Sequence, residues 1–124
     1  MLNNLSSESL EITLRQFELT LLEHMGQPYE WSLDFRSGLV VDEKAYYGFY
    51  VEQGMARVSE SYAIKSPSSC FYGADLLQLA NGNIENVSTL KMAKRLLRLA
   101  LRPIIGYKPL QARELLMQFR QISQ

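Results

Sequence analysis

Five basic side chains in the last third of the chain recur at spacings of three and four residues. They are Lys91, Lys94, Arg95, Arg98 and Arg102. If this stretch is an α-helix, all five lie within about 60° of the first one and form a single positively charged ridge. Such a ridge is suited to phosphate groups, and contacts of this kind are largely independent of base sequence and weaken steeply with salt. The spacing therefore predicts a helix face that binds anions.

The ridge has three other interpretations. Its cations could pair with carboxylates of the same chain or of a partner protein, lie on a membrane surface, or simply face water. A membrane surface is disfavoured because the opposite side of the helix lacks Trp and Phe and is needed for a core. That apolar side consists of Ala93, Leu96, Leu97, Ala100, Leu101 and Ile104.

The distribution of charge keeps the first of these alternatives open. The formal net charge is zero, with 13 Lys and Arg against 13 Asp and Glu. Residues 1–90 hold 12 of the acids and 5 of the bases, a net charge of −7, whereas residues 91–124 hold the other 8 bases and Glu114, a net charge of +7. This split favours either an anionic partner for the last third or docking of the two parts of the chain against each other.

The remaining reactive side chains do not form a catalytic pattern. The chain has a single Cys, Cys70, and a single His, His24, which we expect to be solvated or to cap a helix end. Carboxylates are scattered, and no glycine-rich phosphate loop is present. We therefore expect no enzyme activity, no metal site and no cofactor. We also expect a cytoplasmic location and no membrane partner, since the sequence shows neither a secretory signal nor an apolar run of about 20 residues.

The ridge and the residues around it require a mainly helical frame. With 124 residues, 47% of them hydrophobic, the chain is predicted to form one domain over residues 1–124. A first helix is expected over residues 9–25, ended by Gly26 and Pro28. Its core face is predicted to be the stripe formed by Leu10, Leu14, Phe17, Leu21 and Met25.

Residues 27–72 have a different composition and predict a small β-rich insertion. The runs YYGFYV and MARVS around Gln53–Gly54 indicate a hairpin, and SYAI after it is expected to be extended. Tyr46, Tyr47, Phe49 and Tyr50 could stack on nucleic-acid bases, but packing of the sheet onto the helices is favoured.

The last part of the chain is expected to return to helices. Residues 73–80 predict a short helix, and a longer helix is expected from an N-cap at Ser88 to about Ile104. After Gly106 and Pro109, residues 110–120 predict a further helix that forms a compact hairpin with it. The fold class is thus mainly α, a compact helical domain with a small β-hairpin insertion.

Three segments together resemble the C-terminal part of the bacterial RecO recombination mediators. They are LRQFELTLLEHMG at 14–26, YYGFYVEQGM at 46–55 and TLKMAKRLLRLALRPIIGYKPLQARELLMQF at 89–119. The resemblance covers most of residues 10–120, and it rests on the order and spacing of all three segments rather than on any one of them.

This resemblance implies a non-enzymatic role in DNA repair and recombination. Members of the family bind single-stranded DNA, act with RecR, and dock the acidic, phenylalanine-ended tail of single-stranded-DNA-binding protein. The family's N-terminal OB-fold half has no counterpart here, so we expect it to be absent. Many members hold zinc with four cysteines, whereas this chain has only Cys70, so a zinc-less version of the domain is expected.

The resemblance also implies a tail-docking site on the first helix, where Arg15 and Leu19 match an arginine and a leucine of the family's pocket. With Ile12 and Leu22 they form an apolar patch with one cation, which suits a peptide that ends in phenylalanine and a free carboxylate. Alternatively, this face packs on another element and Arg15 bridges an acid. The leading hypothesis is a RecO-like module for DNA and tail binding, and the alternative is a stand-alone peptide- or protein-binding adaptor without DNA contact.

Overall fold

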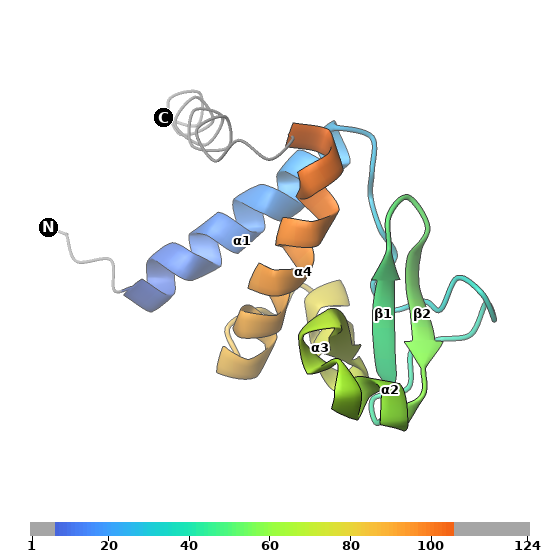
Figure 1. Ribbon diagram of the computed structural model, residues 1–124. Coiled ribbons are helices and arrows are strands. Elements are labelled where there is room, and N and C mark those ends of the chain that lie inside the picture. Colours follow the sequence, from blue (N-terminus) through green and yellow to red (C-terminus); the bar gives the residue numbers. More distant parts are fainter. Residues whose placement is uncertain (1–6, 106–124) are drawn as a thin grey trace, which may run out of the picture.

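The computed structural model describes residues 7–105 of the chain, and within that range helices predominate over a small sheet. In chain order the elements are α1 (Ser7–His24), β1 (Tyr46–Tyr50), β2 (Gly54–Val58), α2 (Glu60–Lys65), a 3-10 turn η1 (Pro67–Ser69), β3 (Cys70–Tyr72), α3 (Gly73–Ala80) and α4 (Val87–Ile105). Figure 1 shows α1 crossing α4 on one side of the molecule, with the sheet on the other. None of the described helices is long and apolar enough to cross a membrane.

Helix α4 is the central element of the core, as its amphipathic pattern predicts. One side of it is buried against α1, α3 and the sheet layer. The buried residues of α4 are Thr89, Leu90, Met92, Ala93, Leu96, Leu97, Ala100 and Leu101. The N-cap is Asn86 rather than Ser88, because the Asn86 side chain accepts a hydrogen bond from the Ser88 backbone N–H at 2.8 Å.

Helix α1 packs with a different face from the one predicted. Leu10 and Met25 are 41% and 52% exposed, whereas Leu22 is 1% exposed. Ile12 and Leu19 also pack against the core. A helix that is apolar on two sides does not reveal from its own sequence which side is buried, and here the choice is set by the contact with α4. Of the predicted stripe, Phe17 is buried and Leu21 packs against the core.

The insertion at 27–72 contains more regular structure than a hairpin. The predicted hairpin is present, with Tyr46 opposite Val58 and Tyr50 opposite Gly54. A third strand, β3, pairs antiparallel with β1 and gives the order β2-β1-β3. The expectation of an extended SYAI segment is wrong: these residues lie in α2, whose N-cap Ser59 accepts a hydrogen bond from the Tyr62 N–H at 3.1 Å.

Of the four aromatic residues at 46–50, Tyr47 is 2% exposed and Phe49 packs against the core, as favoured from the sequence, whereas Tyr46 and Tyr50 are half-buried. The centre of the Trp31 ring lies 6.4 Å from that of Phe49. The Tyr47 hydroxyl accepts a hydrogen bond from the Asp42 N–H at 2.8 Å. Helix α3 begins at Gly73, where a Cβ atom would collide with the Asp42 carbonyl oxygen. The helix predicted over 110–120 lies outside the described residues.

Candidate anion-binding surface

Three of the five ridge cations lie together on the exposed side of α4. Lys91, Lys94 and Arg98 are all exposed, at spacings of three and four residues, opposite the buried apolar side of the helix. Arg102 is exposed as well, in the last turn. We call Lys91, Lys94 and Arg98 the cation surface. Among the described residues, neither Lys91 nor Arg98 forms an ion pair.

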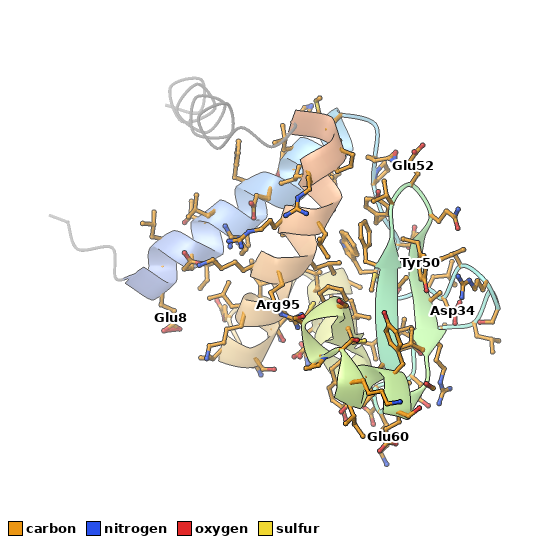
Figure 2. All side chains as sticks on the ribbon, viewed as in Figure 1. Glu8, Asp34, Tyr50, Glu52, Glu60 and Arg95 are labelled. Carbon is orange, nitrogen blue, oxygen red and sulfur yellow. The ribbon has the colours of Figure 1, made fainter. Side chains whose placement is uncertain are left out.

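Arg95, the fifth cation, contacts the sheet and is not part of the cation surface. Its Nη1 donates to the Ser68 carbonyl oxygen at 3.0 Å, and both Nη1 and Nη2 lie 3.3 Å from the Cys70 carbonyl oxygen. Its guanidinium carbon lies 4.8 Å from the centre of the Phe71 ring. Figure 2 shows Arg95 on the side of α4 that faces α2. Arg95 therefore links α4 to β3, a role that its place on the helical wheel does not reveal.

Carboxylates of α1 reach the edge of the cation surface. The Lys94 Nζ atom lies 3.9 Å from Glu11 Oε1, and the same oxygen is 3.4 Å from Arg15 Nη1. Arg15 Nε lies 2.7 Å from Glu18 Oε1, although the two atoms are not aligned as a hydrogen bond. The alternative in which the acidic and basic parts of the chain dock against each other is thus seen at one place, the contact between α1 and α4.

Glu18 is a partly buried acid inside this network. Burial raises the pKa of Glu18 above its usual value of 4.5, and the negative charge of Glu11 acts in the same direction. The positive charges of Arg15 and Arg98 oppose the rise. Arg98 therefore influences a carboxyl group on α1 without forming an ion pair with it.

The four residues predicted for tail docking are brought together, but not as an open slot. Arg15 is 6% exposed and Leu22 is 1% exposed, while Ile12 and Leu19 are half-buried against the core. This is the alternative stated from the sequence, in which the face packs on another element and Arg15 bridges acids. Docking of an acidic tail remains a prediction.

Sequence reasoning missed the two acids that face these cations. Glu11 precedes Arg15 by four residues and Glu18 follows it by three, which are the spacings at which opposite charges meet on a helix. That signal was available in the sequence. The contact of Glu11 with Lys94 was not, because it depends on the crossing of two helices that are far apart in the chain.

The described residues contain no group of three or more His, Cys, Asp and Glu side chains placed to hold a metal ion. Cys70 is buried in β3. Burial raises the pKa of its thiol, and the charge of Arg95 opposes that rise. The neutral thiol is therefore favoured at this position.

Comparison with known proteins gives a consistent result. DNA repair protein RecO of Serratia proteamaculans is 41% identical over 113 residues, which is 90% of this chain and 44% of that protein. The RecO proteins of Yersinia enterocolitica and Pseudoalteromonas translucida are 39% and 38% identical over 92% of the chain, which corresponds to 45% and 47% of their own lengths. No family model matches the chain.

The chain thus spans somewhat less than half the length of the curated relatives it matches. A match of this extent is consistent with the C-terminal domain of those proteins. With about nine-tenths of its residues aligned at this level of identity, the chain is homologous to part of the DNA repair protein RecO.

Proposed function

We propose that this chain serves in DNA repair and recombination by holding the phosphate backbone of single-stranded DNA on the cation surface of α4. The observation that carries the proposal is the exposure of Lys91, Lys94 and Arg98 on one side of a helix whose other side is buried. The names of the relatives supply the biological setting, since they are DNA repair proteins.

The geometry suits a polyanion better than a small anion. Lys91 and Arg98 are seven residues apart, or roughly 10 Å along the helix axis, so one phosphate cannot contact both. A strand that runs along α4 can place successive phosphates beside successive cations. Contacts of this type carry no base specificity, and they release counterions, so the affinity falls as salt rises.

Arg98→Glu tests the proposal. We expect the affinity for a fluorescently labelled single-stranded oligonucleotide, measured by anisotropy at low salt, to fall by about tenfold or more, because one attractive contact becomes repulsive. Lys44→Glu is the matched control: it makes the same charge change at an exposed loop position away from α4, and it should have a much smaller effect.

Two outcomes contradict the proposal. One is equal loss of affinity in Arg98→Glu and Lys44→Glu, and the other is no binding by the parent protein at low salt. Absence of DNA binding, together with binding of an acidic peptide that ends in phenylalanine, would instead support the adaptor function. In that case Arg15 has the chemistry to receive the peptide carboxylate, since it already contacts the carboxylates of Glu11 and Glu18. Cooperation with RecR is part of the same proposal and rests on the family resemblance.

A further inference from the structure

Glu11 lies between two cations that belong to different helices. Its Oε1 atom is 3.4 Å from Arg15 Nη1 on α1 and 3.9 Å from Lys94 Nζ on α4. We infer that Glu11 is a built-in competitor for Lys94, which withholds part of the cation surface from phosphate and thereby sets its affinity. This inference rests on the proposed function, because it describes the regulation of the same surface.

The contact between Glu11 and Lys94 has the properties of a pair that a ligand can displace. The Lys94 side chain is 50% exposed and that of Glu11 is 33% exposed, and their charged atoms are close to the limit of an ion pair. Exposed pairs of this kind are weak and are screened by salt. A phosphate group that approaches Lys94 therefore has to overcome only a weak internal contact.

Glu18 does not have these properties. Its side chain is 22% exposed, and its Oε1 atom lies 2.7 Å from Arg15 Nε, whose side chain is 8% exposed. A buried pair is costly to break because each partner leaves an uncompensated charge. Arg15 keeps this partner when Glu11 is removed. The fold therefore does not depend on Glu11 to neutralise Arg15, and the competing role of Glu11 can be tested separately from stability.

Glu11 lowers the affinity for phosphate in two ways. Its carboxylate occupies Lys94, and its negative charge repels an approaching phosphate. Substitution by Gln removes both effects, whereas substitution by Asp keeps the charge and draws the carboxylate back by one methylene. The two variants therefore separate the local contact from the net charge.

The test uses Glu11→Gln and the matched control Glu60→Gln, which removes the same charge from an exposed position on α2 (Figure 2). We expect Glu11→Gln to bind a labelled single-stranded oligonucleotide several-fold more tightly at low salt. Because Lys94 then contributes a full phosphate contact, the slope of log K against log salt should steepen by roughly 0.7. In a Lys94→Ala background, Glu11→Gln should raise the affinity much less than it does in the parent protein, because only the repulsion by Glu11 is then removed, and Glu11→Asp should show part of the full gain.

The inference is overturned if Glu11→Gln and Glu60→Gln change the affinity equally, or if Glu11→Gln raises the affinity as much in the Lys94→Ala background as in the parent protein. A second readout does not depend on DNA binding: titration with pyrophosphate, followed by the NMR signal of the Lys94 side chain. We expect tighter pyrophosphate binding at Lys94 in Glu11→Gln than in the parent protein. If Glu11→Gln and the parent protein bind pyrophosphate equally well at Lys94, the proposed competition is wrong even if DNA binds. Absence of DNA binding with a changed titration would contradict only the proposed function.

Discussion

Asp34 shows how one buried side chain can organise a loop. It is 7% exposed, and its carboxylate accepts hydrogen bonds from three backbone N–H groups: those of Arg36 at 2.9 Å, Ser37 at 3.2 Å and Arg57 at 3.2 Å. Burial by itself opposes ionisation. The three hydrogen bonds outweigh it and hold the pKa of Asp34 below its usual value of 3.8.

Asp34→Asn should therefore be destabilising in a pH-dependent way. We expect the free energy of unfolding near pH 7 to fall by about 1–3 kcal/mol, because an amide cannot accept all three bonds. A lowered pKa contributes stability that is present above pH 3.8 and is lost as the pH falls through the lower value in the folded state. The difference in unfolding free energy between Asp34→Asn and the parent protein should thus become smaller as the pH falls below 3.8.

Urea denaturation near pH 7 and near pH 3 measures this difference. Asp42→Asn is the control, since Asp42 is exposed and its carboxylate accepts only a local hydrogen bond from the Lys44 N–H. A loss of stability in Asp34→Asn that is the same at both pH values would contradict the assigned role.

At the scale of the elements, the basic side chains of α4 have two different roles, although the sequence pattern places all five of them in one row. The cation surface faces outward, and Arg95 contacts the sheet. Helical periodicity predicted the existence of α4 and its buried side, because both follow from local spacing. The direction of the Arg95 side chain, in contrast, depends on the neighbouring elements, and its neighbour β3 was not predicted from the sequence.

Arg95→Ala and Lys91→Ala should separate these functions. Arg95→Ala should lower the free energy of unfolding by about 1–3 kcal/mol, because carbonyl groups of β3 and η1 lose a charged donor. Lys91→Ala should change stability by less than about 0.5 kcal/mol and should lower the affinity for single-stranded DNA. Urea denaturation and anisotropy, applied to both variants, check the assignment. It is wrong if Arg95→Ala is as stable as the parent protein.

At the scale of the whole molecule, the main error of the sequence reasoning was the orientation of α1. The helix and its end near Gly26 were predicted correctly. Its buried side was not, because the two apolar stripes of α1 are similar in content and only the contact with α4 distinguishes them. The sequence left open whether the face around Arg15 is an open patch or packs on another element; in the structure Arg15 is 6% exposed, on the helix that packs against α4.

Leu22→Ala and Met25→Ala test this orientation. Leu22 is 1% exposed, so its truncation should cost about 2–5 kcal/mol of unfolding free energy, through lost burial and a residual cavity. Met25 is 52% exposed, and its truncation should change stability by less than about 0.5 kcal/mol. Thermal or urea denaturation gives both values. The reverse order of the two effects would mean that α1 packs with the stripe first predicted.

The two outer strands of the sheet have consequences for how any protein can join it. The free side of β2 is occupied by the segment around Asp34, where the Phe35 N–H donates to the Met55 carbonyl oxygen at 2.9 Å. In β3, the other outer strand, the Cys70 carbonyl oxygen accepts a hydrogen bond from the Arg95 guanidinium. Exposed sheet margins commonly recruit an extended peptide or a second copy of the same strand. Within residues 7–105, each margin therefore carries a contact that an added strand would have to displace, which disfavours strand addition and the aggregation that accompanies it.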